Sequence, residues 1–178
     1  MALSIIGALG LANIALTLLV IRRLGEHSRL LAENASARPA SAAGWPAAID
    51  VAPGEQIGDF AVTAFDGTPV SRRDLNGRTL VGFVAPGCPA CDASLPDFIE
   101  RAGAAEGGRD QVVAVVMGDA RAAGEVCEQL APVARVLTED QEAGPLATAF
   151  GVGGLPAFAL LAGDTVVASH SLIERLPA

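Results

Sequence analysis

The sequence contains no lysine, no tyrosine and a single tryptophan, and only three of its 178 residues are cysteine. All basic residues are arginine, and the excess of acidic residues gives a net charge of −8, which argues against nucleic acid as a partner. Three cysteines allow at most one intramolecular pair, which is too few for a disulfide-stapled scaffold. A closely spaced pair is therefore a candidate for catalysis or metal binding.

Charge is also missing from the start of the chain, because no charged side chain occurs between Ala2 and Ile21. Twenty helical residues rise about 30 Å, which is the thickness of one hydrocarbon core. A cleaved signal peptide, the alternative, would begin with positive charge, and none precedes this apolar run. We therefore predict an uncleaved transmembrane anchor over residues 1–22.

The rest of the chain divides into a linker and a folded domain. Residues 23–53 begin with arginine and glutamate at i,i+4 spacing and continue as an Ala-, Ser- and Pro-rich stretch, which is typical of a linker. In the folded domain, residues 54–178, periodicity and turn residues predict alternating strands and helices followed by a hairpin, hence an α/β sandwich with a mixed central sheet. The predicted strands are 60–64, 68–70, 79–84, 111–117, 133–137, 158–161 and 165–169, and the predicted helices are 90–104, 121–130, 145–150 and 171–176.

Two cysteines stand at the junction between the predicted strand 79–84 and the helix that follows it. Cys88 and Cys91 flank Pro89-Ala90, directly after a Pro-Gly turn. Unpaired backbone N–H groups and the helix dipole favour negative charge at a helix start, so we expect a stabilised thiolate at Cys88. Pro89 suits the first helical turn, where its missing N–H is not needed. This arrangement predicts a dithiol–disulfide site.

Three features of the domain resemble the thioredoxin fold. The Cys88-Pro89-Ala90-Cys91 motif follows a central strand, and Pro96 lies where thioredoxin-like proteins carry a helix-kinking proline. Gly154-Leu155-Pro156, just before a predicted strand, matches the cis-proline loop of that family. The anchor, the linker and the leading hairpin are most similar to the membrane-tethered TlpA/ResA-like redoxins, and the opening segment also resembles MauD, a methylamine dehydrogenase accessory protein.

The resemblance implies a thioredoxin-like α/β/α sandwich and a thiol–disulfide oxidoreductase of the protein disulfide reductase type. In such a site Cys88 is the nucleophile, Cys91 is the resolving cysteine and Pro156 belongs to the cis-proline loop. The resemblance implies no metal and no cofactor other than a redox-active disulfide between Cys88 and Cys91. The positions that it assigns to substrate binding are Gly87, Pro89, Gly154 and Leu155.

The implied partners are protein thiols and disulfides, the membrane, and a membrane-linked electron donor. The chain would act as a reductant or as a maturation factor, and its redox direction depends on a potential that the sequence leaves open. We expect the domain on the extracytoplasmic side of the membrane, because an oxidising exterior suits a dithiol site. Arg22, Arg23 and Arg29 after the span argue against this orientation, and the sequence does not settle it.

Several alternatives remain beside this interpretation. A peroxiredoxin would need Thr or Ser where Ala85 stands, three residues before Cys88. A copper chaperone would use Cys88, Cys91 and His170, and a non-catalytic maturation factor would use the same cysteines. His170 itself is predicted to be a surface or capping residue, and Cys127 is predicted to be a core thiol on an apolar helix face.

The active-site motif also departs from the usual pattern of the thioredoxin-like family. Gly87 replaces the tryptophan that commonly precedes the first cysteine, and Ala90 replaces a proline or histidine. No acid occupies the strand end at Phe83 or Val84. Residues 139 and 140, both acidic, are candidates for a base near the site, but we expect them to lie in a solvated loop.

Overall fold

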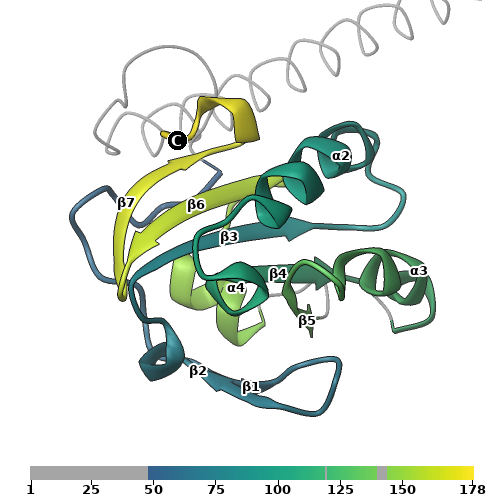
Figure 1. Cartoon of the computed structure of the whole chain (residues 1–178), viewed down its shortest axis with the longest axis horizontal. Coiled ribbons are helices and arrows are strands. Elements are labelled where there is room, and N and C mark those ends of the chain that lie inside the picture. The colour runs from purple at the N-terminus through teal and green to yellow at the C-terminus, as the bar shows by residue number, and fades with distance from the viewer. Residues whose placement is uncertain (1–47, 119, 140–143) are drawn as a thin grey trace, which may run out of the picture. The chain divides into compact units, whose positions relative to one another are not determined.

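The computed structural model describes residues 48–118, 120–139 and 144–178 (Figure 1). The predicted anchor and residues 23–47 of the predicted linker lie outside this part of the chain. Within it, no helix is both long and apolar enough to cross a membrane. The strands are β1 (Ala61–Thr63), β2 (Pro69–Ser71), β3 (Arg78–Val84), β4 (Val112–Met117), β5 (Arg135–Glu139), β6 (Ala157–Ala162) and β7 (Thr165–His170). The helices are α2 (Pro89–Gly103), α3 (Ala120–Leu130) and α4 (Pro145–Phe150), with short 3-10 turns η1 (Arg72–Asp74), η2 (Gly108–Gln111) and η3 (Ile173–Arg175).

Five strands form the central sheet in the order β5-β4-β3-β6-β7 (Figure 1). Strand β3 runs parallel to β4, and β4 runs parallel to β5, so each of these pairs is joined by a helical crossover. Strand β6 is antiparallel to β3 and pairs with β7 across a tight hairpin. The predicted α/β architecture with a mixed sheet is confirmed.

Both faces of the sheet are buried, each beneath its own apolar core. On β3, Leu80 and Val84 face the side covered by α2 and α3, whereas Val81 and Phe83 face the side covered by α4 and the β1-β2 hairpin. This alternation is the two-residue period of a strand. The central strands therefore read as continuous apolar runs, and the end of β3 lies where the two cores meet.

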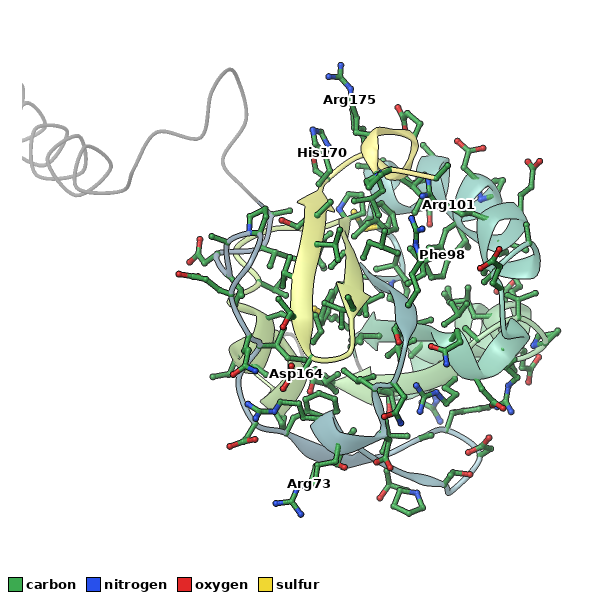
Figure 2. The ribbon with its side chains drawn as sticks, turned by 60° about the vertical axis from the view of Figure 1, so that its left-hand side comes forward. Arg73, Phe98, Arg101, Asp164, His170 and Arg175 are labelled. Carbon is green, nitrogen blue, oxygen red and sulfur yellow. The ribbon has the colours of Figure 1, made fainter. Side chains whose placement is uncertain are left out.

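A close contact sets α2 against the strand that leads to the cysteines. Gly82 in β3 has no side chain, and a Cβ built on it would lie 2.6 Å from the ring of Phe98 in α2. That ring stacks on Phe158 of β6 with centroids 5.7 Å apart. Figure 2 shows Phe98 in the interior between helix and sheet. The glycine therefore fixes how near the helix comes to the sheet.

The described chain begins with a short segment, residues 48–51, that packs on the domain although the sequence placed it in the linker. Ile49 is 2% exposed and forms an antiparallel bridge with Val152. The N–H of Asp50 donates to the carbonyl of Gly151 at 2.8 Å. The segment is thus held against the chain that leads from α4 toward residues 154–156.

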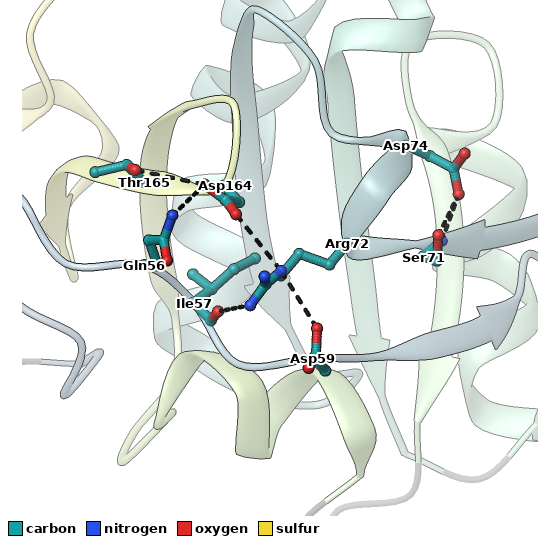
Figure 3. Close-up of polar contacts among 8 residues, drawn as sticks. All are labelled: Gln56, Ile57, Asp59, Ser71, Arg72, Asp74, Asp164 and Thr165. Atoms are coloured by element: carbon teal, nitrogen blue, oxygen red, sulfur yellow. Dashed lines mark hydrogen bonds and ion pairs between the residues drawn. The ribbon is translucent and has the colours of Figure 1, made fainter.

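Arg72 joins three segments that are distant in the sequence (Figure 3). Its Nε lies 3.3 Å from a carboxylate oxygen of Asp59 and 3.5 Å from one of Asp164, in the turn between β6 and β7. Its Nη1 donates to the carbonyl of Ile57 at 3.1 Å. One half-buried guanidinium therefore holds residues 57–59 and the end of the β1-β2 hairpin against the β6-β7 turn, at the edge of the central sheet.

Two predicted boundaries are wrong by a few residues. Strand β5 begins at Arg135 rather than at residue 133, because the N–H groups of Val133 and Ala134 still donate to Leu130 and complete the end of α3. The predicted last helix, 171–176, is only the three-residue turn η3. The backbone is extended at Leu172 and again at Leu176, which leaves a single 3-10 turn between them.

Candidate active site

Cys88 lies at the N-terminal end of α2, immediately after the turn that ends β3. Its N–H donates to the carbonyl of Ala85. Its carbonyl accepts the N–H of Asp92 at 2.9 Å, which is the first hydrogen bond of the helix. Gly87 has a positive φ of 70°, a conformation that glycine adopts without a steric penalty. Pro89 is the first residue of α2, as predicted. Cys88 is therefore the N-cap residue of α2.

The sulfur of Cys88 takes the place that an oxygen usually takes in an N-cap. The N–H of Cys91 donates to Cys88 Sγ at 3.3 Å. The side chain is half-buried and packs against both apolar cores, so it stands at the seam between them. Cys88 Sγ is therefore a hydrogen-bond acceptor at the N-terminus of α2, within reach of solvent.

Cys91 is in a different environment, one turn into the helix and only 2% exposed. Burial is the main cause that raises the pKa of its thiol to about 12, and a hydrogen bond with Cys88 adds to it. A backbone hydrogen bond from Ala85 acts in the opposite direction without cancelling the rise. Cys91 is therefore a protonated thiol at neutral pH, and all three cysteines are free in this structure.

The loop at residues 154–156 lies beside the end of β3. Ala157 of β6 pairs with Phe83 of β3, so the residues just before Ala157 flank those just after Phe83. The peptide bond between Leu155 and Pro156 is cis, as the resemblance implied. Leu155 packs against the same two cores as Cys88, and Pro156 is buried. The sheet therefore brings this loop and the cysteines together.

Pro96 lies inside α2 and is exposed to solvent. Its missing N–H removes the bond that would close on the carbonyl of Asp92, yet α2 continues on to Gly103. In the same turn, Ser94 Oγ donates to the carbonyl of Ala90 at 2.9 Å, a contact that often accompanies a local bend. The helix thus tolerates the proline on its solvent face.

Glu139 corrects one expectation, because it is 6% exposed rather than solvated. Its carboxylate accepts hydrogen bonds from the N–H groups of Leu146 at 2.5 Å and Ala147 at 3.0 Å. The side chain therefore caps the first turn of α4 from the end of β5. No local pattern in the sequence signals this contact, since the two partners are separated by a loop.

Two other predicted residues, Cys127 and His170, lie outside the Cys88–Cys91 motif and the cis-proline loop. Cys127 is fully buried in α3, where burial raises the pKa of its thiol, so the predicted core thiol is confirmed. His170 ends β7, and its Nδ1 accepts the N–H of Leu172 at 2.9 Å, which fits the predicted capping role. Within the described ranges, His, Cys, Asp and Glu form no group of three or more that would hold a metal.

Several solved structures share the fold of this domain. A disulfide oxidoreductase secreted by Mycobacterium tuberculosis and homologous to E. coli DsbE is 22% identical over 63% of this chain and 82% of that one, with a TM-score of 0.52. A candidate thiol:disulfide interchange protein DsbE from Chlorobium tepidum is 25% identical over 67% and 85% of the two chains, with a TM-score of 0.52. An uncharacterised conserved protein from Geobacillus kaustophilus is 23% identical over 76% and 78%, with a TM-score of 0.59.

These similarities show a thioredoxin-like fold for the domain. No curated protein sequence matches the chain significantly. The sequence profile of the redoxin family matches residues 52–174, which include both cysteines of the motif and the cis-proline loop. Because this match covers more than half of the sequence, the chain belongs to the redoxin family.

Proposed function

We propose that the chain is a thiol–disulfide oxidoreductase that exchanges the Cys88–Cys91 dithiol and disulfide with protein substrates. The observation that carries the proposal is the difference between the two sulfurs. Cys88 is half-exposed and accepts a backbone N–H, whereas Cys91 is buried and has a pKa raised to about 12. One sulfur is thus reachable by a substrate at the N-terminus of α2, and the other is held in reserve as a buried thiol.

The reaction begins when the Cys88 thiolate attacks one sulfur of a substrate disulfide. A bond forms between Cys88 Sγ and that sulfur, the substrate S–S bond breaks, and the other substrate sulfur leaves as a thiolate. Cys91 then loses its proton to that thiolate or to water and attacks Cys88 Sγ. The second substrate sulfur leaves, and two electrons have passed from the dithiol to the substrate.

The first step removes part of what keeps Cys91 protonated. Its pKa is raised by burial first, then by the hydrogen bond and the charge of Cys88, and also by the charge of Asp92. Once Cys88 is in a mixed disulfide, its negative charge is gone, whereas the burial and the charge of Asp92 remain. We expect Cys91 to ionise more readily in the mixed disulfide than in the free dithiol, which orders the two steps.

Tethering to a membrane through residues 1–22 is part of the same proposal, with the domain outside the cytoplasm. Support comes from the uncharged run at the start of the sequence, and an oxidising exterior suits a dithiol site. In this setting the domain would act as a reductant or a maturation factor for protein disulfides. A membrane-linked donor would supply the electrons, since each turnover leaves the dithiol oxidised.

The test is to trap the mixed disulfide in cells that produce the full chain. Cys91→Ser removes the resolving thiol, so substrates should stay attached to Cys88 and run as covalent adducts on non-reducing gels. Cys88→Ser should trap none, because Cys91 is only 2% exposed. Cys127→Ser combined with Cys91→Ser is the matched control and should trap as much as Cys91→Ser alone. If Cys88→Ser traps partners as well as Cys91→Ser does, the assigned roles are wrong.

A further inference from the structure

Residues 48–51, which we call the pairing segment, form hydrogen bonds with the chain just before the cis-proline loop. The N–H of Asp50 donates to the carbonyl of Gly151 at 2.8 Å. The N–H of Gly153 donates to the carbonyl of Ala48 at 3.0 Å. Because Gly153 directly precedes the loop, the pairing segment holds the main chain up to the point where the loop begins.

The pairing segment also contributes a buried side chain to the core beside the loop. Ile49 is 2% exposed, forms an antiparallel bridge with Val152 and belongs to the same apolar core as Phe150. A Cβ built on Gly151 would lie 2.8 Å from the Cβ of Asp50, so this glycine lets the two chains come close together. The end of α4 and the residues after it are therefore held by both main-chain and side-chain contacts.

The loop that is held in this way borders the reactive sulfur. Leu155 packs against both apolar cores, as Cys88 does, and Pro156 is buried. On the C-terminal side of the loop, Ala157 pairs with Phe83 of β3. On its N-terminal side the chain pairs with residues outside the central sheet, so the position of the loop beside Cys88 depends on the pairing segment as well as on β6.

We propose that Ile49 and the main chain of Asp50 are positioning residues for thiol–disulfide exchange, because they fix the N-terminal side of the loop beside Cys88. The inference rests on the proposed oxidoreductase function and adds to it residues that lie outside the motif and the loop. A peptide disulfide extends beyond the sulfur over the surface that the loop forms, so its reaction depends on where the loop lies. Hydroxyethyl disulfide is small and needs only access to Cys88 Sγ.

Two pairs of variants separate positioning from stability. Asp50→Pro removes the N–H that the carbonyl of Gly151 accepts, and its control, Asp50→Ala, keeps that N–H. Ile49→Ala is matched by Ile57→Ala, which removes the same atoms from a side chain that is 1% exposed in the same core. The N–H of Ile57 donates to Asp164 in the turn at the other end of β6. Ile49→Val, which removes only the terminal methyl group, is the conservative variant.

The assay compares two disulfides on the reduced full chain. One is a peptide whose single cysteine is joined to glutathione, and the other is hydroxyethyl disulfide. Each reaction is quenched in acid, and the released thiols are measured by chromatography to give a rate constant. In each turnover the dithiol becomes the Cys88–Cys91 disulfide, and two electrons and two protons convert the peptide disulfide into peptide thiol and glutathione. The readout is the ratio of the two rate constants, because a loss of folded protein lowers both equally.

In Asp50→Pro and Ile49→Ala the rate constant for the peptide should fall about tenfold relative to that for hydroxyethyl disulfide. The control variants and Ile49→Val should keep the wild-type ratio. A wild-type ratio in Asp50→Pro would overturn the proposal, and so would an equal fall in Ile49→Ala and Ile57→Ala. If circular dichroism shows that Ile49→Ala does not fold, the Asp50 pair decides. A wild-type chain that reduces neither disulfide would instead refute the proposed function.

Discussion

Removal of the Glu139 carboxylate should destabilise the domain more than removal of any exposed acidic side chain. The carboxylate is buried and accepts the N–H groups of Leu146 and Ala147 at the start of α4. In Glu139→Ala both donors lose their acceptor, and both belong to residues that are at most 6% exposed. Water therefore cannot readily replace the lost acceptor.

The magnitude follows from these two bonds. A hydrogen bond to a charged group contributes about 1.5–3 kcal/mol, and loss of a helix cap costs about 1 kcal/mol in typical proteins. Because the two bonds share one carboxylate, we expect a loss of about 3 kcal/mol in the free energy of unfolding for Glu139→Ala. Glu139→Gln is the matched control, since its amide keeps one acceptor oxygen, and it should lose about half as much.

Urea unfolding of the reduced chain, followed by circular dichroism, measures both values. The same samples can be assayed for hydroxyethyl disulfide reduction, because α4 leads into the segment that carries the Leu155–Pro156 bond. A loss below about 0.5 kcal/mol for Glu139→Ala would refute the reasoning, since that is the range of ordinary surface substitutions. An equal loss in Glu139→Gln would show that the charge, rather than the two acceptors, stabilises the helix.

Three further predictions concern the cysteine, the strand–helix contact and a partly buried arginine. Burial raises the pKa of Cys91 to about 12, so the folded chain keeps a proton on this thiol that the unfolded chain releases near pH 9. The free energy of unfolding, measured by urea titration, should therefore fall between about pH 9 and 12. The fall should be smaller in Cys91→Ser. Gly82→Ala should cost about 1–3 kcal/mol in urea unfolding, and Phe98→Leu should recover part of the loss if the ring is what the new methyl meets. Two buried nitrogens of Arg135, Nε and Nη2, have no hydrogen-bond partner among the described residues. We therefore expect Arg135→Met to have a thermal unfolding temperature equal to or higher than that of the wild type.

The dithiol could be predicted from sequence because every signal for it is local. An apolar strand, a Pro-Gly turn and Cys88-Pro89-Ala90-Cys91 are adjacent in the chain, and helix capping depends only on neighbouring backbone groups. The end of the predicted helix 145–150 is local as well, because Gly151 ends α4 in a left-handed conformation. The strand–helix alternation then determined the class of the fold.

The features that sequence reasoning missed depend on contacts between distant segments. Glu139 reads as part of an acidic loop, whereas in the structure it ends β5 and caps the N-terminus of α4. Residues 48–51 read as linker because their composition is that of a linker, yet Ile49 finds a bridge partner in Val152. The cis state of the Leu155–Pro156 bond came from the family resemblance, since the residue pattern alone favours trans.

The difference in burial between the two cysteines is likewise non-local, although the motif that holds them is local. The helix start predicts Cys88 as the reactive sulfur, but spacing alone gives no difference in burial between two thiols one helical turn apart. Their difference arises because Gly82 lets α2 approach β3, which buries Cys91 in the core shared with Phe98, while the turn at Gly87 leaves Cys88 at the seam between the two cores. A change at Gly82 should therefore alter the pKa of Cys91 as well as the stability of the fold, because the same packing that holds the helix also keeps water from the thiol.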